Sequence, residues 1–439
     1  MTSRKPICWA IGVALSISAP FACATSVMDA YFAAQKNDPQ FRSAVAENQA
    51  GQEYKNLGKS GLLPTVQYVY ATSKNKAQQT LSAIPYPEYT SITNNVSLRQ
   101  VLFSLDATAR FKQGKVQTKQ SDAILLSKSA DLIVRLFSAY ADAKYAEDQL
   151  SLIQAQRDTL AEQLRLNETM LKKGEGTRTD VLETRAKLDV AEAQVIEAAD
   201  NVNVTRNTLA AMTGDEIRQL DKFRDNFALM SLSTTKLSDW EQIARDNNPE
   251  LLAARYSVEA SELEIDKAKA GHTPRLDLNA SYNRSISDTL QTLRSDNTVR
   301  SIGVQLVVPI YSGGSVSASS RQAVANKERA TSDLDGANKR VLNELSKQFY
   351  AMQSGTAKMR ALEKSVESAN LLVDATSKSI KAGFRINVDL LNALQQLTLA
   401  KRDLAMARYG YLLSFLRLRA AAGVLSQDDL QTVAAYFTK

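Results

Sequence analysis

Two short stretches of the chain place a glycine and polar side chains at matching intervals. Gly174 is followed six residues later by Asp180, and Gly383 is followed six residues later by Asp389. A helix-ending glycine and an acid in the first turn of the next helix would explain either stretch alone. Because the pattern occurs twice, about 209 residues apart, it indicates two equivalent helical turns. The charged side chains beside these turns are candidates for ion pairs.

Side chains that catalyse reactions or hold metals are scarce. The sequence contains one histidine, His272, and two cysteines, Cys8 and Cys23. His272 therefore has no second histidine with which to hold a metal. No G-x-S-x-G elbow, phosphate loop or metal-ligand spacing occurs in the context that each requires. The sequence predicts a protein that is not an enzyme and that uses no cofactor and no metal.

The charge of the chain is small and spread thinly. Its formal net charge is +7 at pH 7, and Arg4 and Lys5 contribute to it. No lysine and arginine run suited to tracking phosphates occurs, so we expect no nucleic-acid partner. Apolar residues make up 44% of the sequence, which allows a substantial core.

The first 24 residues are typical of a secretory signal peptide. Arg4 and Lys5 form a positive region, residues 7–17 an apolar region, and Ala22-Cys23-Ala24 a small-x-small cleavage site. We predict cleavage after Ala24, which leaves a mature chain without cysteine. The alternative is lipidation at Cys23, which the preceding Pro20-Phe21-Ala22 disfavours because it lacks a branched apolar residue and a small pair. No later stretch approaches the ~20 apolar residues of a membrane helix.

The chain repeats itself with an offset of 207 to 210 residues. This offset stays nearly constant along the sequence, which indicates one duplicated architectural unit. We place the first repeat at residues 25–236 and the second at residues 237–439. The matching pairs include Asn37-Asp38-Pro39 with Asn247-Asn248-Pro249, Gly61 and Pro64 with Gly271 and Pro274, and Gly214 with Gly423.

Each repeat contains one very long helix and several shorter ones. Helical patterns cover residues 26–36, 39–59, 107–173 and 180–211, and then 249–270, 315–381 and 389–420. A helix of about 67 residues is about 100 Å long, a length that suits a tube. Two shorter helices stacked end to end would nearly match it, with a gap of about 20 Å. We expect the irregular segments 213–237 and 423–439 to surround that gap as a belt.

Each repeat also contains two strand-like stretches, at about 65–73 and 92–103 and at about 275–285 and 299–310. Leu276 and Leu278, for example, alternate with Asp277 and Asn279. This period of two over about ten residues is typical of transmembrane β-barrel strands. Four strands cannot close a barrel, since the smallest have about eight, and lipid does not tolerate an open edge. The predicted fold is mainly α with a transmembrane β-barrel, built from two, three or more copies.

These features together resemble the TolC family of outer-membrane channel-tunnel proteins over essentially the whole mature chain. They include the turns at Phe103-Ser104 and Tyr311-Ser312-Gly313-Gly314 and a tip motif at residues 382–391. That motif is Ala-Gly-Phe-Arg-Ile-Asn-Val-Asp-Leu-Leu, against a family pattern of Val-Gly-Thr-Arg-x-x-x-Asp-Val-Leu. The resemblance implies a homotrimer, with a twelve-stranded barrel in outer-membrane lipid and a twelve-helix tunnel in the periplasm. It also implies a periplasmic adaptor protein and an inner-membrane pump, an ABC transporter or another exporter.

The resemblance further implies a gate at the periplasmic tip, held shut by hydrogen bonds and ion pairs. The gate and tip positions carried over by motif are Thr179, Asp180, Arg385 and Asp389, with Gly174 and Gly383 in the turns where the adaptor docks. One hypothesis is that Arg385 bridges to Thr179 or Asp180 in the shut state. Another is that Asp389 from each copy forms a carboxylate ring, in which like charges raise one another's proton affinity and attract cations.

Two positions depart from the family pattern at this gate. Asn392 stands where the best-studied pattern has an aspartate, and Ile380 stands where it has a tyrosine. One acidic ring and one aromatic hydrogen bond would then be missing. We therefore expect a gate that is less cation-selective or more easily opened.

Other classes of protein also use long helices in the periplasm. A periplasmic adaptor would carry a signal peptide and helical hairpins, but it would not need two pairs of amphipathic strands. A filamentous coiled coil is disfavoured by the strands and by the signal peptide. Among channels, the weak lipidation signal favours type I secretion of unfolded proteins, with multidrug efflux as the alternative.

Overall fold

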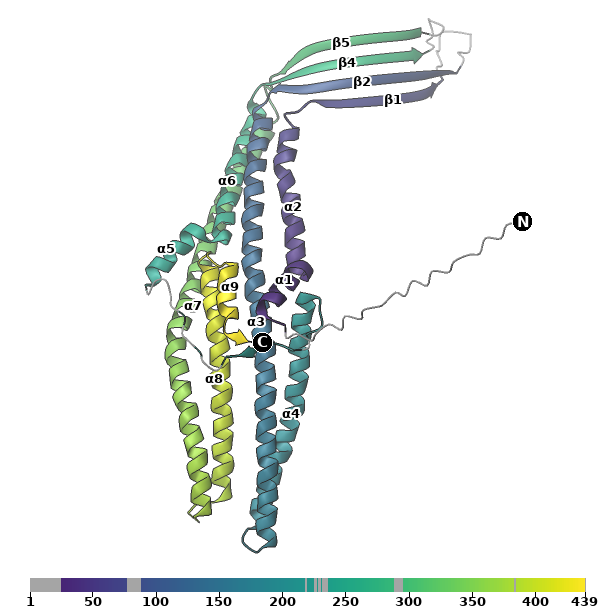
Figure 1. Ribbon diagram of the computed structural model, residues 1–439. Helices are drawn as coiled ribbons and strands as arrows, with labels where there is room; N and C mark the ends of the chain where they lie inside the picture. Colours follow the sequence, from purple (N-terminus) through teal and green to yellow (C-terminus); the bar gives the residue numbers. More distant parts are fainter. Residues whose placement is uncertain are drawn as a thin grey trace, which may run out of the picture.

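The computed structural model describes residues 25–76, 88–217, 219–224, 227, 230, 236–287, 295–382 and 384–438. The predicted signal peptide at 1–24 and the predicted tip glycine Gly383 lie outside these residues. The described chain is a long rod of helices with a curved β-sheet at one end (Figure 1). Within it, no helix is both long enough and apolar enough to cross a membrane.

Both halves of the chain contain two helices, two strands and two further helices in the same order, and the second half also has a 3-10 turn and α9. The first half contains α1 (Val27–Asn37), α2 (Pro39–Ser60), β1 (Thr65–Asn75), β2 (Tyr89–Phe103), α3 (Leu105–Lys172), α4 (Arg178–Thr213) and β3 (Lys222–Phe223). The second contains α5 (Leu237–Asn247), α6 (Pro249–Lys269), a 3-10 turn (Ala270–His272), β4 (Arg275–Ser287), β5 (Ser295–Val307), α7 (Ser315–Lys381), α8 (Asn387–Ala421), α9 (Gln427–Ala434) and β6 (Phe437–Thr438). The division at residues 236 and 237 stays a prediction.

The long helices α3 and α7 contain 68 and 67 residues. At 1.5 Å per residue each is about 100 Å long, as the sequence predicts. Each turns back into a shorter helix, so that α3 with α4 and α7 with α8 form two hairpins. The turns of both hairpins lie at the end of the rod away from the sheet (Figure 1).

The shorter helices do stack end to end, but the predicted gap between them is wrong. The Asn248 side chain accepts from the backbone N–H groups of Glu250 and Leu251, which caps α6. Its amide also donates to the carbonyl of Ala421 at the end of α8, at 2.8 Å. In the first half, the Asn37 amide donates to the carbonyl of Thr213 at the end of α4. These asparagines satisfy carbonyls that a helix end leaves without partners, so the helices abut directly.

The core runs along the middle of the rod, where both halves meet. The predicted inner stripe of α3 is confirmed, since Leu132, Leu136 and Tyr140 are at most 1% exposed. Leu345 and Phe349 of α7 belong to the same hydrophobic cluster. Spacing of i, i+4 places such residues on one face of a helix, which the neighbouring helices then cover.

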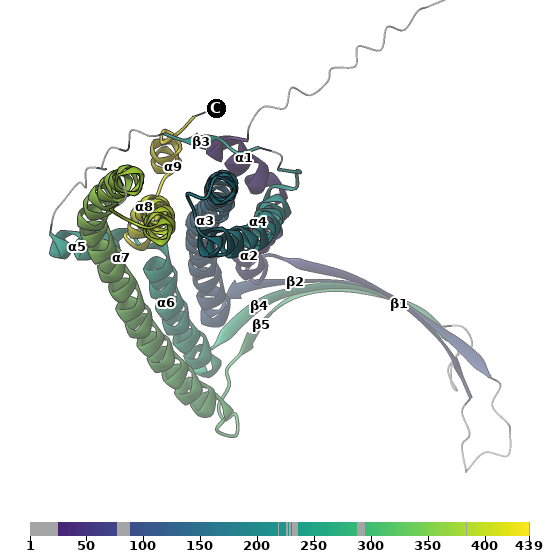
Figure 2. The ribbon, with the colours of Figure 1, turned by 90° about the horizontal axis from the view of Figure 1, so that it is seen from below.

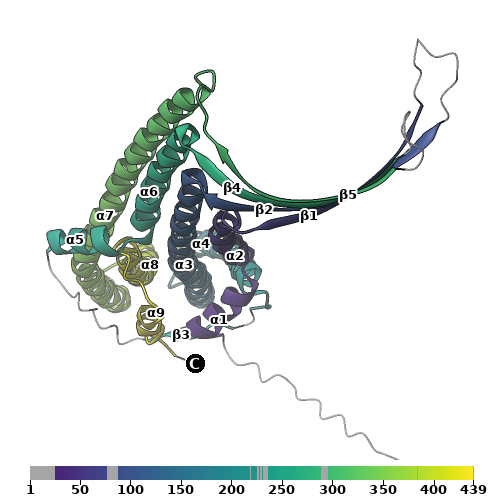
Figure 3. The same cartoon turned by 90° about the horizontal axis from the view of Figure 1, so that it is seen from above.

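The four strands form one antiparallel sheet in the order β1-β2-β4-β5 (Figure 1), and the sheet is strongly curved (Figure 3). The register aligns Val66, Leu98, Ala280 and Ile302 across one face and Gln67, Ser97, Ser281 and Ser301 across the other. The predicted apolar and polar faces are therefore confirmed. The apolar face is open, with Val66, Tyr68, Ile302 and Leu306 between 62% and 78% exposed.

The strand boundaries differ from the predicted ones. β2 begins at Tyr89 and β5 at Ser295, each a few residues before the predicted start, because polar residues continue the hydrogen-bonded ladder. β5 ends at Val307, not at Ile310. Pro309 has no N–H group to donate to a ladder, so the strand stops before it.

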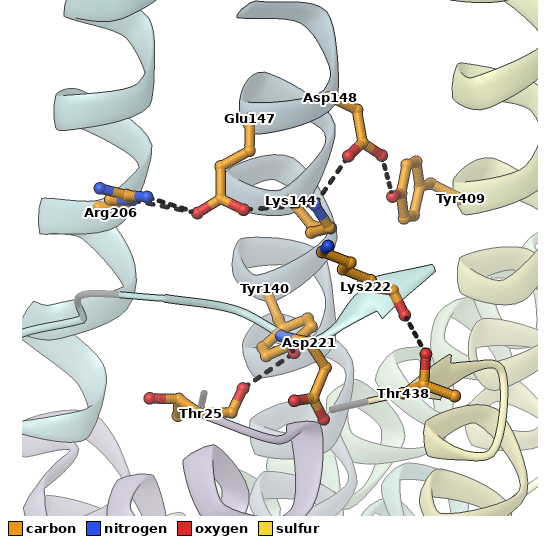
Figure 4. Close-up of polar contacts among 10 residues, drawn as sticks. All are labelled: Thr25, Tyr140, Lys144, Glu147, Asp148, Arg206, Asp221, Lys222, Tyr409 and Thr438. Carbon is orange, nitrogen blue, oxygen red and sulfur yellow. Dashed lines mark hydrogen bonds and ion pairs between the residues drawn. The ribbon is translucent and has the colours of Figure 1, made fainter. Parts of the chain in front are cut away.

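The described parts of the irregular segments lie together on one side of the helices (Figure 2), at the level of the middle of the rod (Figure 1), as the predicted belt. β3 pairs with β6, and Thr25 forms a bridge with Leu220. The Tyr140 hydroxyl donates to the carbonyl of Thr25 and accepts from the N–H of Asp221, at 3.0 and 3.1 Å (Figure 4).

The belt is also more regular than predicted, because it contains α9. Ser426 and Asp429 form a reciprocal capping box at the start of that helix. A serine followed three residues later by an acid is a known signature of a helix start. The prediction of an irregular segment overlooked this signature.

Candidate gate at the helical tips

The first tip is built by a tight turn between α3 and α4. Gly174 has φ 78°, a left-handed conformation that favours glycine after a helix. Thr177 then caps α4, and its hydroxyl lies 2.6 Å from a carboxylate oxygen of Asp180. The same oxygen accepts from the N–H of Thr177 at 3.2 Å. The Asp180 carboxylate thus stabilises the start of its own helix, while Thr179 beside it is exposed.

The second tip, between α7 and α8, presents large apolar side chains to solvent. Phe384 is 86% exposed and Ile386 is 66% exposed. Arg385 Nη1 lies 3.9 Å from Asp389 Oδ2, one helical turn further on, and both side chains are more than a third exposed. At this separation and exposure the pair stabilises the helix only weakly.

The structure therefore brings together two of the four predicted gate residues. Arg385 lies beside Asp389, whereas among the described residues of one chain no ion pair or hydrogen bond joins Arg385 to Thr179 or Asp180. Asp180 and Arg385 each have a partner on their own hairpin. The bridge between the hairpins stays a prediction.

A buried amide cluster, defined here as Gln163, Asn167, Thr184 and Asn387, joins the two hairpins close to the tips. The Gln163 side-chain amide donates to Oδ1 of the Asn387 side chain at 3.0 Å. The Asn387 and Asn167 amides both donate to the Thr184 hydroxyl, at 3.0 and 2.9 Å. Asn167, Thr184 and Asn387 are at most 8% exposed. Because buried polar groups are costly to leave unpaired, these bonds hold α8 against α3 and α4.

Sequence reasoning missed this cluster, although the duplication contains a signal for it. Asn167 and Thr184 correspond to Thr376 and Ala393 at the common offset, and all four positions are buried. Thr184 is thus a hydroxyl where the second hairpin has a methyl group. The two hairpins therefore differ at equivalent buried positions, and the hairpin with the Thr184 hydroxyl is the one that bonds to Asn387.

The tips contain no arrangement suited to covalent chemistry. Across the part of the chain that the structure describes, no group of three or more histidine, cysteine, aspartate or glutamate residues could hold a metal ion. The tip residues instead make hydrogen bonds and an ion pair, which can form and break without any change in covalent bonds. Such contacts suit a conformational gate.

Comparison with known proteins identifies the architecture. A family model described as outer membrane efflux protein matches residues 30–215 and 240–424. The chain belongs to this outer membrane efflux protein family. The two matched segments start in α1 and α5 and end at the joints formed by Gly214 and Gly423, so the family model matches each half of the chain separately.

Several known proteins are similar to this chain over nearly their whole length. The alkaline protease secretion protein AprF of Pseudomonas aeruginosa is 39% identical, over 100% of this chain and 92% of that protein. The proteases secretion protein PrtF of Dickeya chrysanthemi is 37% identical, over 97% of this chain and 94% of that protein. A crystal structure of CusC superposes with a TM-score of 0.80 at 14% identity, over 91% of this chain and 92% of that one.

Membership in the outer membrane efflux protein family confirms the expected family. The family consists of channels, so the protein is not an enzyme. The protein is an outer-membrane export channel whose helical part extends into the periplasm. It is the outer-membrane component of a multipart export system, which implies an adaptor protein and an inner-membrane pump as partners.

Proposed function

We propose that three copies of the chain assemble into one export duct. β1 and β5 are the two edges of the sheet, and a lipid-embedded sheet must pair its edges. Two copies would supply eight strands, and barrels of about eight strands are filled by their own side chains. Three copies would supply twelve strands and a lumen. The exposed apolar face would then contact lipid, and the polar face would line the lumen.

The cargo that fits best is protein released by type I secretion. Support comes from the names of two relatives, the alkaline protease secretion protein AprF and the proteases secretion protein PrtF. In the proposed trimer the polar face of the sheet would line an open lumen, which suits an extended polypeptide. Multidrug efflux is the second candidate function, because the family model describes efflux proteins.

The N-terminal residues support cleavage rather than lipidation. Thr25 is held at the belt, where its N–H donates to the carbonyl of Gln219 at 2.8 Å. The 22 residues of α2 lie between that level and the sheet (Figure 1). They span about 33 Å, whereas the two residues from Cys23 to Thr25 reach only about 7 Å. An acyl chain on Cys23 therefore could not enter the membrane around the sheet.

We infer that the mature chain begins at Thr25 without lipid. Mass spectrometry of the N-terminal peptide from protein purified out of outer membranes tests this. The expected peptide starts with an unmodified Thr25, and a diacylated Cys23 peptide would contradict it.

The gate proposal rests on the tips. We propose that Arg385 contributes to the shut state, either through Asp389 or through Thr179 or Asp180 of an adjacent hairpin. Replacing Arg385 with serine should raise the single-channel conductance severalfold in a planar bilayer, because one set of tip contacts is lost in every copy. The comparison is with wild type at the same salt concentration.

Arg360→Ser is the matched control, since Arg360 is an exposed arginine on α7, well above the tip. It should leave conductance unchanged. Equal conductance in wild type and Arg385→Ser would remove Arg385 from the gate while keeping the channel. Absence of any conductance in wild type would count against the duct itself.

A further inference from the structure

The polar face of the sheet carries very few charges. The register places Thr65, Arg99, Asn279 and Gly303 in one row on this face, and the rows beyond it contain serine, threonine, asparagine, glutamine and a few uncharged apolar or aromatic residues. Among the described strand residues on this face, the charged ones are Arg99, Arg275 and Asp277. They sum to a net charge of +1 per chain. All three lie at the end of the sheet next to the helices.

Asp277 holds both arginines in place. One of its carboxylate oxygens lies 3.0 Å from Arg99 Nη2 on the neighbouring strand, and the other lies 3.0 Å from Arg275 Nε. Its side chain is only 2% exposed, whereas those of Arg99 and Arg275 are 51% and 41% exposed. Each guanidinium has five N–H donors and uses one of them here.

The backbone around this cluster is locally fixed. The pairing of β2 with β4 shifts register between Val101 and Phe103, directly opposite Asp277. Gln100 donates to the carbonyl of Leu62, in the segment that links α2 to β1, at 2.8 Å. A bulge of this kind redirects a strand and the side chains on it. The cluster therefore occupies a defined position where the strands meet the helices.

We propose that Arg99 and Arg275 form a cationic ring at the junction of tunnel and barrel, which binds carboxylate groups of acidic segments in the exported polypeptide. This inference rests on the proposed trimeric duct, in which the ring would contain six arginines and a net charge of +3. Guanidinium groups recognise carboxylates through paired N–H donors. Asp277 acts as a positioning residue, because it orients the arginines without being exposed to cargo.

The test uses block of single channels by poly-L-glutamate at low salt, added to the barrel side or the tip side of a planar bilayer. Poly-L-glutamate on the barrel side should block wild-type channels. The variant Arg99→Gln/Arg275→Gln should need about tenfold more of it, because the local positive potential is lost. Raising the salt concentration should weaken the block of wild type more than that of the variant.

The matched control is Arg284→Gln/Arg300→Gln, which removes the same charge from the opposite face of the same sheet. Arg284 pairs with Asp296 there, and Arg300 lies over the ring of Tyr282. This control should be blocked like wild type. Equal block of all three proteins, or block from the tip side alone, would overturn the ring.

The remaining outcomes are also informative. The trimer of each variant is first checked as a heat-sensitive band on a gel, and its basal conductance confirms an assembled pore. If wild type forms no pore, the proposed duct fails. If pores form but the ring variant is blocked normally, only this inference fails.

Discussion

Replacing Gly423 with alanine is expected to destabilise the chain by about 3 kcal/mol or more. Gly423 ends the turn after α8 with φ 74°, where an L side chain is strained. A Cβ atom there would lie 2.5 Å from backbone atoms of Asn247 and Asn248. That backbone cannot withdraw easily, because Asn248 caps α6 and also holds the end of α8. Circular dichroism melting of the detergent-solubilised protein, with the trimer band on a gel, measures the effect.

Two other glycines supply the comparison. Gly214 stands at the equivalent joint with φ 78°, but its nearest neighbour is the Asn37 side chain, at 2.8 Å. Gly214→Ala should therefore cost less than Gly423→Ala, since a side chain can move. Gly410 lies inside α8, and an added Cβ meets nothing within 4 Å. Gly410→Ala should stabilise α8 by up to about 1 kcal/mol. Equal melting temperatures for Gly423→Ala and Gly410→Ala would contradict the close packing of Gly423 against Asn247 and Asn248.

Replacing Lys144 with methionine is expected to cost about 3 kcal/mol, as loss of one partner from a buried ion pair typically does. Lys144 is 7% exposed, and its Nζ lies 2.7 Å from Asp148 and 3.3 Å from Glu147 (Figure 4). Glu147 also pairs with Arg206 of α4 at 2.7 Å. Asp148 accepts from the Tyr409 hydroxyl of α8 at 2.6 Å. Lys144 thus neutralises two carboxylates that connect α3 to both flanking helices.

The tyrosine in this network cannot replace the lost charge. Burial raises the pKa of Tyr409, and the nearby Asp148 raises it further, so the phenol stays protonated and acts only as a donor. Methionine fills the space of the lysine stem but leaves the adjacent half-buried carboxylates of Asp148 and Glu147 without a lysine, and only Glu147 keeps a cationic partner, Arg206. The same melting experiment measures the loss of stability. Adding Asp148→Asn should restore part of it, because one of the two anions is then removed.

Lys347→Met is the charge-matched control for Lys144→Met. Lys347 is 70% exposed and lies 3.7 Å from Glu344, so its loss should change stability by less than about 1 kcal/mol. A melting temperature for Lys144→Met that equals that of the control would show that Lys144 is not structurally required.

Local features of the sequence were sufficient for most of the elements. Proline at the first position of α2 and α6, preceded by Asp38 and Asn248 as caps, marks where those helices begin. The period of two in the strands predicts which face is apolar, because neighbouring side chains in a strand point to opposite faces. The errors occur at the ends, as at Pro309, and in α9, where short elements contain little periodicity.

The tip site was predicted less completely than the fold. The sequence identifies the turns and the residues beside them, since Gly174 and Asp180 follow local rules for helix ends. It does not identify Asp389 as the neighbour of Arg385, because several acids lie within reach of a flexible arginine. The buried amide cluster depends on Gln163 and Asn387, which are more than 200 residues apart in the sequence.

The sequence by itself determined the helices and strands, the duplication and the family, since each depends on periodicity or on motifs that neighbouring residues define. Only the tertiary structure decided which polar side chains meet between helices and strands. Lys144 could equally have been an exposed lysine on an amphipathic helix, and Asp277 an ordinary polar residue of a strand. Their burial depends on how helices about 100 Å long pack side by side and on one register shift in the sheet. Periodicity assigns a side chain to a face, but the partner on that face is decided by packing across the whole molecule.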